Sequence, residues 1–363
     1  MTTLAPENPT FPPAPLPRPH AYTSQYAELL GQIKGMGLLE RRRGFYITLM
    51  VLLTVAMVGT FVAMASIGAS WWQLALAPVL GILFTQFAFL GHELAHKQVF
   101  TSGPLNDALG QFLAHFVVGI SYSWWNNKHS RHHQNPNTIG KDPDIDSDVI
   151  AFQDDQAQSA RGLQRKIVQN QGWLFFPLLT LEGINLHVQG LKRAFSAEHF
   201  PGRSTEISLL LARHAVFIGA LFFVMPPGIA LAFLAIELAV FGVYMGASFA
   251  PNHKGMPLIP AGEKVDFLRR QVLTSRNIRG GRFMDFLFGG LNYQVEHHLF
   301  PNMPRPSLQA AATIVREYCK THAVRYTETS LLQSYVQVIQ YLNRVGLRAR
   351  DPFECPVASL GGR

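Results

Sequence analysis

Cysteine is almost absent from this 363-residue sequence, which contains only Cys319 and Cys355. Two cysteines so far apart form no metal-binding pair and no disulfide framework. The sequence also lacks the Gly-x-Gly-x-x-Gly turn that binds dinucleotides, and no basic stretch in it alternates with aromatic residues. These absences argue against a disulfide-stabilised domain, a dinucleotide-binding enzyme and a nucleic-acid-binding protein.

Charged residues are missing from long stretches of the chain. Between Gly44 and Gly91 there is no Asp, Glu, Lys or Arg. A helix that spans a bilayer needs about 20 apolar residues, so this stretch is long enough for two crossings, at Phe45–Ile67 and Trp72–Gly91. A second pair is predicted at Ile207–Met225 and Gly228–Phe249, split by two prolines. The predicted fold is an all-α integral membrane protein with four transmembrane helices in two hairpins.

Lys and Arg are unevenly distributed around these crossings. Arg41, Arg42 and Arg43 precede the first crossing and further basic residues lie between the hairpins, whereas the two tight outer turns carry none. Basic residues collect on the cytoplasmic side of membrane proteins. We therefore predict a multi-pass protein with both termini and the segment between the hairpins in the cytoplasm, in the inner membrane if the source is bacterial. Arg213, near the start of the third crossing, is expected to extend toward the membrane interface.

The remaining chain is predicted to form a cytoplasmic helical cap. Residues 1–20 contain seven prolines and no apolar run, and are expected to be a disordered lead without a signal peptide. Residues 21–363 are expected to form one membrane domain, with a cap helix over Arg282–His298. The acidic stretch Lys141–Asp148 lacks the glycine and the distal glutamate of a calcium loop, which favours a solvated turn.

Histidine is the most informative residue in the chain. "HELAH" places His92 and His96 four residues apart, and "HSRHH" places His129, His132 and His133 at i, i+3 and i+4. "QVEHH" repeats the second spacing, with Gln294 followed by His297 and His298, and "PNHKG" adds His253. On a helix, residues three and four apart share one face. All eight histidines are expected at one side of the membrane, and together they predict a metal site.

The number and type of ligands restrict the metal. Neutral imidazole suits zinc, copper, iron and nickel, and a structural zinc needs only four ligands. Eight histidines therefore fit two metals with about four imidazoles each. Glu93 and Glu296 are expected to lie behind the ligands and to accept hydrogen bonds from imidazole N–H groups. The other six histidines are expected to have packing or surface roles, and His187 is the most plausible exception because it follows Glu182 and Asn185 in a segment at the membrane edge.

These motifs resemble the three histidine boxes of the membrane fatty acid desaturases. The likeness is greatest to the subgroup whose third box opens with glutamine, which includes linoleoyl-CoA and front-end desaturases, and it covers nearly the whole chain after the lead. "WWNNKHSRHHQNPN" and "GGLNYQVEHHLFPNMPR" also match. The resemblance implies a non-haem centre of two iron ions that uses O2 and two electrons to remove two hydrogens from a fatty acyl-CoA or acyl lipid. It also implies that His253 is a ligand.

Two features depart from the closest pattern. Many relatives carry a fused cytochrome b5 with an HPGG motif, which this sequence does not contain. A separate electron donor is therefore expected, such as a ferredoxin, a cytochrome b5 or a flavin reductase with NAD(P)H. "HELAHK" also resembles the first box of membrane alkane hydroxylases, so hydroxylation is the alternative activity. A membrane zinc-binding receptor or metal transporter is the alternative without catalysis.

Two expectations concern the surroundings of the metals. The apolar substrate should enter from the bilayer into a tunnel between the crossings, where Tyr122, Trp124 and Trp125 could line the wall or belong to an interfacial aromatic belt. Gln294 is expected beside the metals, where its amide would hydrogen-bond an oxygen ligand or bind weakly. Gln294, Glu93 and Glu296 are accordingly the candidate residues that support catalysis.

Overall fold

The computed structural model describes residues 19–349, which are mostly helical. The proline-rich residues 1–18 lie outside this range, and the first helix begins at Pro19. The elements are, in order, α1 Pro19–Gly35, α2 Arg43–Ile67, η1 Trp71–Ala75, α3 Leu76–Ala95, α4 Gly103–Phe112, η2 Leu113–Val118, α5 Tyr122–Gln134, η3 Pro143–Ile145, α6 Asp154–Ser159, α7 Gly162–Gln169, α8 Gln171–Leu179, α9 Glu182–Ala194, α10 Arg203–Val224, α11 Pro227–His253, α12 Phe267–Leu273, β1 Asn277–Arg279, α13 Gly281–Leu287, α14 Gln294–Leu299, η4 Arg305–Ser307, α15 Leu308–Thr321, β2 Glu328–Ser330, α16 Leu331–Gly346 and η5 Leu347–Ala349.

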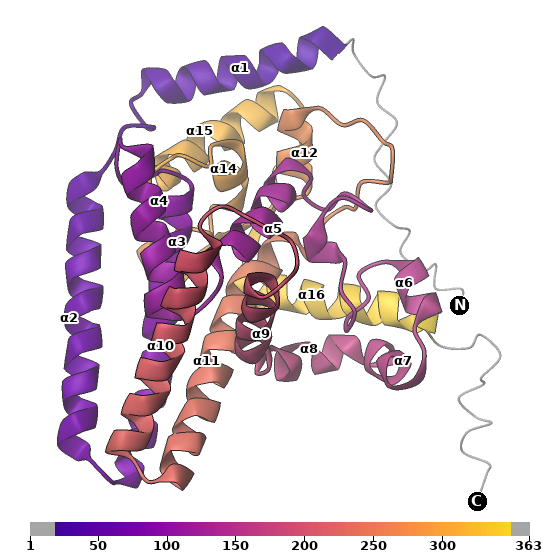
Figure 1. Cartoon of the computed structure of the whole chain (residues 1–363). Helices are drawn as coiled ribbons and strands as arrows, with labels where there is room; N and C mark the ends of the chain where they lie inside the picture. The colour runs from indigo at the N-terminus through magenta and orange to yellow at the C-terminus, as the bar shows by residue number, and fades with distance from the viewer. Residues whose placement is uncertain (1–18, 350–363) are drawn as a thin grey trace, which may run out of the picture.

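Four helices are long and apolar enough to cross a membrane, as the charge-free stretches predicted. They are Arg43–Ile67, Trp71–Ala95 (η1 and α3 together), Arg203–Val224 and Pro227–His253. They run side by side toward one end of the molecule, and the shorter helices gather at the other end and along one flank (Figure 1). The chain thus forms two helical hairpins whose tips point the same way.

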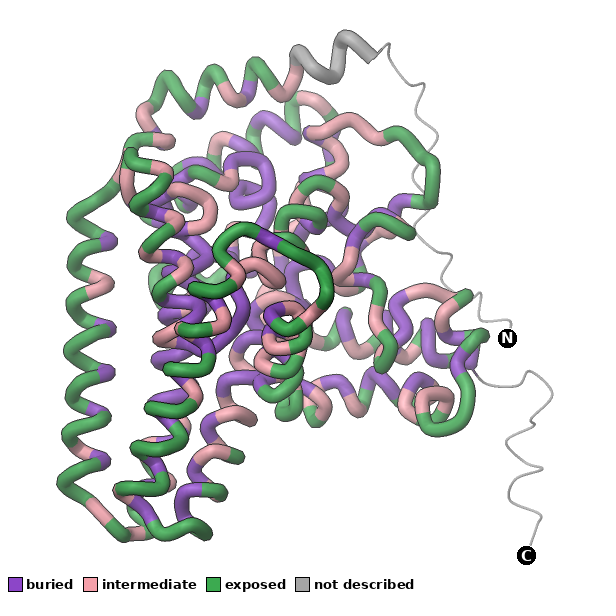
Figure 2. Tube along the Cα trace, in the orientation of Figure 1, coloured by how far each residue is buried: buried purple, intermediate pink, exposed green. Residues whose placement is uncertain are grey.

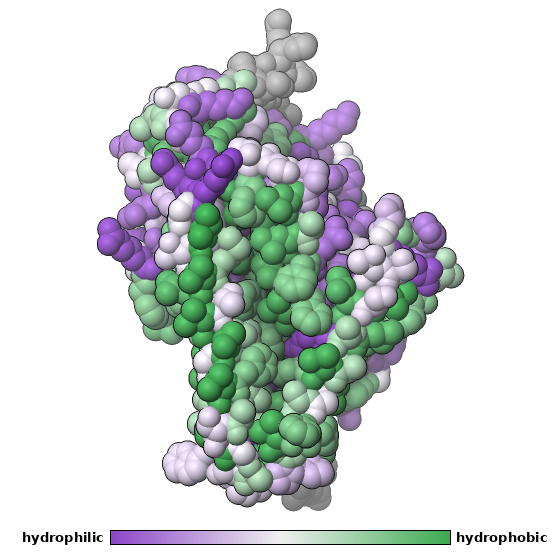
Figure 3. Space-filling view, turned by 60° about the vertical axis from the view of Figure 1, so that its left-hand side comes forward, coloured by the Kyte–Doolittle hydropathy of each residue, from purple (hydrophilic) through white to green (hydrophobic). Residues whose placement is uncertain are grey.

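The outer surface of α2 is apolar and suits a lipid environment. Its buried residues form a narrow stripe that includes Leu53, Met57 and Met64, whereas Leu52 and Val55 are 61% and 64% exposed. The exposed side of this helix is clearly visible in Figure 2, and apolar residues cover the surface around the long helices in Figure 3. An apolar surface of this extent is unfavourable in water, so it faces the hydrocarbon of a bilayer.

The tip of the first hairpin closes through one glutamine. Helix α2 ends at Gly68, which has φ +59°, and its last carbonyl groups have no partner within the helix. The buried side chain of Gln73 donates from Nε2 to the backbone oxygens of Met64 at 2.6 Å and Gly68 at 2.8 Å. No backbone carbonyl can be left unpaired at low cost in an apolar environment, so Gln73 stabilises the turn.

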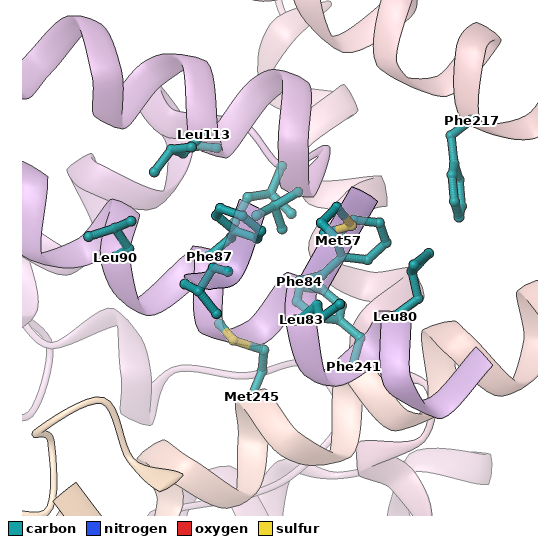
Figure 4. Close-up of a cluster of buried hydrophobic side chains, with 14 of the residues drawn as sticks. Met57, Leu80, Leu83, Phe84, Phe87, Leu90, Leu113, Phe217, Phe241 and Met245 are labelled. Atoms are coloured by element: carbon teal, nitrogen blue, oxygen red, sulfur yellow. The ribbon is translucent and has the colours of Figure 1, made fainter. Parts of the chain in front are cut away.

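Small residues let the central helices approach closely. Figure 4 shows Leu80 and Phe84 of α3 in the same apolar cluster as Phe241 and Met245 of α11. A Cβ atom on Gly81 would lie 2.8 Å from the backbone oxygen of Glu237, so α3 and α11 meet where α3 has no side chain. Association of helices in lipid depends on such close packing. The contact fixes two helices that both end at the histidines.

The region around the third histidine motif differs from its prediction. The sequence predicted one helix over Arg282–His298, but the structure has two short helices, α13 and α14, separated by a turn. Gly289 and Gly290 have φ +58° and +82°, which residues with a side chain rarely adopt. A Cβ atom on Gly289 would also lie 2.6 Å from the ring of Phe89. The turn therefore redirects the chain against α3.

The cap contains the two strands found within residues 19–349. Strand β1 pairs in parallel with β2, and Asn277 lies opposite Glu328. Helix α16 begins directly after β2, at Leu331. Helices α12, α14 and α15 pack on α1 around one apolar cluster, and α16 packs with α8 around another.

A pair of glycine substitutions tests the close helix packing. A Cβ atom on Gly242 of α11 would lie 2.4 Å from the backbone nitrogen of Gly183 in α9, whereas one on Gly219 of α10 would meet nothing within 4 Å. We expect Gly242→Ala to destabilise the protein by about 1–3 kcal/mol through overpacking, although alanine is the better helix former. The matched Gly219→Ala should be neutral or slightly stabilising. Thermal unfolding in detergent measures both, and equal midpoints would contradict the packing.

Candidate metal centre

The eight histidines singled out in the sequence come together at one end of the long helices. Their ring nitrogens form two groups, and within each group the ligand atoms lie within 4.8 Å of one another. The five-histidine group consists of His92, His96, His129, His133 and His297, and the three-histidine group consists of His132, His253 and His298. The structure therefore brings together every histidine that the sequence predicted as a ligand, but divides them five and three rather than four and four.

The predicted helical spacing explains how one helix serves both groups. In α5, His129 and His133 belong to the five-histidine group and His132 to the three-histidine group. In α14, the neighbours His297 and His298 divide in the same way. The rings of His133 and His298 stack with centroids 4.2 Å apart. The two groups are consequently adjacent.

Four helices present these histidines from their last turns. His92 lies in the last turn of α3, His132 and His133 in that of α5, His253 in that of α11, and His297 in that of α14. The C-terminus of a helix carries a partial negative charge and favours a cation nearby. The helix ends therefore add a field that suits a positively charged ligand.

In the three-histidine group, the outer ring nitrogens are all held by oxygen acceptors. Nδ1 of His132 lies 3.0 Å from both carboxylate oxygens of Asp142. Nδ1 of His253 lies 3.0 Å from the backbone oxygen of Thr274, and Nδ1 of His298 lies 2.9 Å from Oε1 of Gln271. Such an acceptor keeps the proton on Nδ1 and leaves the lone pair on Nε2. The three Nε2 lone pairs therefore face a common space.

This donor set fits a transition metal. Nε2 of His298 is buried and has no hydrogen-bond partner, although an unpaired buried polar atom is costly. Nε2 of His253 lies 3.3 Å from that of His132, and both carry lone pairs. A cation between the three rings would satisfy all of these atoms, which is the arrangement expected of imidazole ligands.

Burial keeps most of the rings uncharged. It lowers the pKa of His96 to about 4. Burial and then the neighbouring imidazoles hold the pKa of His129 and His133 well below the usual value. His132 differs: burial lowers its pKa, but Asp144 and Asp142 outweigh burial and raise it. Since a metal binds neutral imidazole, all but one of these rings are ready to bind at neutral pH.

The two glutamates do not hold the histidines, contrary to the prediction. Glu93 accepts hydrogen bonds from Nε and Nη2 of Arg305, both at 2.7 Å, and from the hydroxyl of Tyr46. Glu296 accepts from Nδ2 of Asn277 at 2.7 Å and from the hydroxyl of Tyr326 at 2.9 Å. Each glutamate adjoins a ligand in sequence, and one residue along a helix turns the side chain to another face. They anchor α3 and α14 rather than the rings.

The acidic loop was also misjudged from the sequence, which favoured a solvated turn. Asp142 is buried, and besides His132 it accepts the backbone N–H of Asn137 at 2.7 Å. Its neighbour Asp144 pairs with Lys128 at 2.8 Å. The chain between His132 and Asp142 is not one regular helix. Their spacing in the sequence therefore could not predict that the two side chains are in contact.

Gln294 lies beside the three-histidine group, as expected. Its Nε2 is 2.9 Å from Nε2 of His253, and its Oε1 accepts a hydrogen bond from Nδ2 of Asn252 at 3.0 Å. Both amides are buried. Asn252 precedes a predicted ligand, and the sequence analysis gave it no role.

A narrow apolar pocket of about 20 Å³ has His92 in its lining. Its wall includes Phe87 and Phe89 of α3, Tyr122 and Trp125 of α5, and Met245 and Phe249 of α11. Trp125 also stacks on His129 with ring centroids 4.7 Å apart. Tyr122 and Trp125 thus line a cavity as one of the two predictions had it, whereas Trp124 packs against the apolar cluster around α3.

Helix α10 supports the segments next to this cavity. Arg213 was expected to reach the interface, but it is buried: its Nε donates to the backbone oxygen of Val117 at 3.2 Å, and its guanidinium lies 4.0 Å from the ring centroid of Phe217. Val117 lies in the π-helical turn η2, which has carbonyl groups to satisfy. Glu206 accepts the backbone N–H of Ser123 at 3.3 Å, at the start of α5. At this position the negative charge of Glu206 interacts favourably with the dipole of α5.

Comparisons with known proteins agree with this site. The sequence model of the family described as "Fatty acid desaturase" matches residues 69–330. The chain is 28% identical over 341 residues to the Delta(8)-fatty-acid desaturase 2 of Arabidopsis thaliana, covering 90% of this chain and 75% of that protein. It is 30% identical to the Delta(6)-fatty-acid desaturase fat-3 of Caenorhabditis elegans (76% and 65% covered) and to an acyl-lipid (9-3)-desaturase of Physcomitrium patens (79% and 57% covered).

The contact between Asp142 and His132 generates a prediction. Asp142→Asn removes the charge that holds the His132 proton on Nδ1, and such a partner typically changes metal affinity 10- to 100-fold. We expect ferrous iron to be lost to a competing chelator at a concentration lower by about tenfold or more. Asp146→Asn changes an exposed aspartate of the same loop and should have no effect. Equal retention of iron in the two variants would show that the contact does not tune the site.

Proposed function

Because the chain belongs to the fatty acid desaturase family, we propose that it is an O2-dependent acyl desaturase that introduces a cis double bond into the chain of a fatty acyl-CoA or acyl lipid. The observation that carries this proposal is a narrow apolar pocket whose lining includes His92, one of the eight clustered histidines. A long apolar substrate and a set of metal ligands are thereby placed in contact.

The eight histidines are proposed to hold two iron ions, one beside each group. When bound, an iron pair supplies the power to oxidise an unactivated methylene with O2 and two electrons, which is beyond any amino-acid side chain. The protein's own part is placement. The Nδ1 acceptors orient the rings of the three-histidine group so that their Nε2 lone pairs face inward. Burial favours the neutral form of the rings, although Asp144 and Asp142 oppose it at His132.

An acyl chain would lie along the apolar lining of this pocket, against the five-histidine group. Phe87, Met245 and Phe249 provide an apolar wall, and Trp125 lies between the cavity and His129. A chain lying here exchanges lipid for apolar side chains, so its transfer costs little, and its position is set by shape. The distance from the closed end of the cavity to His92 would then decide which carbons face the metals.

The remaining predicted site residues act by positioning. Glu93 ties α3 to Arg305, which follows α14 in the chain, so this buried ion pair would hold the first and third histidine motifs in register. Glu296 ties α14 to Asn277 of β1. Gln294 is the member of this set that faces the metals. Removing one partner of a buried ion pair leaves the other uncompensated.

The relatives' names describe Delta(8), Delta(6) and acyl-lipid desaturases. Either head group, acyl-CoA or acyl lipid, is compatible with a cavity that contacts only the chain. Electrons are proposed to come from a separate donor, such as a ferredoxin, a cytochrome b5 or a flavin reductase with NAD(P)H. Arg42, Arg131 and Arg282 are exposed at the histidine end, and such a surface attracts an acidic partner.

The same basic residues support an orientation. The tips of the two hairpins, at Gly68–Ser70 and Pro226, carry no Lys or Arg, whereas Arg41–Arg43 lie at the histidine end. By the positive-inside rule, the metal centre and both termini would face the cytoplasm. This places the centre on the side where soluble reductants are available.

Expression in a host of defined fatty acid composition tests the proposed function. We expect a new fatty acid with one more double bond, located by mass spectrometry of derivatives, and purified protein with about two iron ions per chain. His298→Ala, expressed to the same level, is the inactive control, since its Nε2 faces the site and has no other partner. Hydroxylated products without a new double bond would favour the alternative activity. One zinc ion per chain would contradict a di-iron enzyme.

A substitution in the cavity tests the route of the acyl chain. Ala114 lines the cavity and is buried, so Ala114→Phe should occupy space needed by the chain. We expect the rate with the preferred chain to fall about 10- to 100-fold, as expected for a displaced substrate, or a shorter chain to be preferred, at unchanged iron content. Ala65→Phe, on the exposed face of α2, is the control. Wild-type products from Ala114→Phe would place the acyl chain elsewhere.

A further inference from the structure

We infer that Gln294 is a fixed hydrogen-bond donor to a small anionic or oxygen ligand beside the three-histidine group, and that Asn252 is the positioning residue that fixes it. The inference rests on the metal centre proposed above. It chooses between the two roles left open for Gln294 in the sequence, because a donor orientation excludes coordination through the amide oxygen.

The orientation of the Asn252 amide is determined by its surroundings. One end of this amide lies 3.2 Å from the backbone oxygen of Ser248 and 3.1 Å from that of Leu291. Backbone oxygens only accept hydrogen bonds, so the group that faces them must be the NH2. The opposite end, Oδ1, is buried without a partner. Turning the amide over would place three oxygens together and is therefore excluded.

The Asn252 NH2 in turn determines the orientation of Gln294. It lies 3.0 Å from the nearer end of the Gln294 amide, which must then be the oxygen. The NH2 of Gln294 is therefore directed the other way, to a position 2.9 Å from Nε2 of His253. If the Gln294 amide were turned over, its NH2 would face the NH2 of Asn252, and two donors would oppose each other. The chain of bonds from Ser248 and Leu291 thus extends through two amides to the metal site.

An amide NH2 facing this space is a donor and not a ligand. Nδ1 of His253 is bound to the oxygen of Thr274, so its Nε2 carries the lone pair that faces the site. The nitrogen of an amide offers hydrogens and no free lone pair to a cation. Around this group the protein therefore supplies three imidazole ligands and one donor. Metal sites with three protein ligands and an open position are typical of catalytic centres.

By the same count of protein ligands, the five-histidine group has no open position for a small anion. It already has five imidazoles within 4.8 Å of one another. A small anion should therefore bind at the three-histidine group, where the N–H of Gln294 stabilises it. A hydrogen bond to a charged group is worth about tenfold or more in affinity.

Azide binding to the purified, iron-loaded full-length protein tests the inference, followed by the absorption of the complex, with iron content measured on the same samples. Gln294→Ala should keep its iron but bind azide about tenfold or more weakly. Asn252→Asp should weaken azide to a similar degree, because an aspartate offers only acceptors and would attract the Gln294 NH2 away from the site. If Asn252→Asp does not fold, Asn252→Ala, which leaves the Gln294 amide free to turn, should also weaken azide.

Two further variants calibrate the experiment. Gln73→Ala removes a buried glutamine at the far tip of the first hairpin and should change neither iron content nor azide affinity. His298→Ala should lose iron. Unchanged azide affinity in Gln294→Ala, or loss of iron as large as in His298→Ala, would overturn the donor role. Wild-type azide affinity in the folded Asn252 variants would overturn the role of Asn252. Absence of iron from the wild-type protein would instead overturn the proposed function.

Discussion

The structure depends on one constraint: eight imidazoles must face one another inside the protein, where burial opposes their charged forms. Each ring needs its lone pair on the inner nitrogen, and in the three-histidine group this requires an oxygen acceptor at the outer nitrogen. Asp142 supplies one acceptor from the loop after α5, and Gln271 and Thr274 supply the other two from α12 and the residue that follows it. The cap is therefore organised around hydrogen bonds to the backs of the histidines.

The long helices serve this arrangement by bringing their ends together. Helices α3 and α11 both run from the hairpin tips to the histidine end, and they meet closely at Gly81. Their last turns carry His92 and His253, so the two helix dipoles present their negative ends to the same place. The membrane region thus contributes ligands and field as well as the apolar cavity.

Charges near the centre are neutralised in pairs. Glu93 binds Arg305 through both carboxylate oxygens, and Asp144 binds Lys128. The Glu93–Arg305 pair is buried, and such a pair contributes little net stability but is costly to break, whereas the Lys128–Asp144 pair is more than a third exposed and therefore weaker. Here each pair joins an element that carries ligands to another part of the chain, so these pairs determine position more than stability.

The sequence by itself determined the four long apolar helices and the histidines that come together at their ends. An absence of charge between Gly44 and Gly91 and the spacing within "HSRHH" are local patterns, and bilayer thickness and helical pitch translate them directly into spans and into a shared face. The helix predicted from the local pattern at Arg282–His298 was wrong, because Gly289 and Gly290 form a turn that divides it.

Only the tertiary structure decided how the centre is divided and supported. The five-and-three division depends on where α5 and α14 meet, and the roles of Asp142, Arg305 and Asn252 depend on contacts with residues whose spacing has no helical period. Arg213 likewise became buried because Val117 offered it a carbonyl oxygen from another segment. Local composition determines the secondary structure that each segment can form. Long-range packing determines which acceptor a buried polar group contacts.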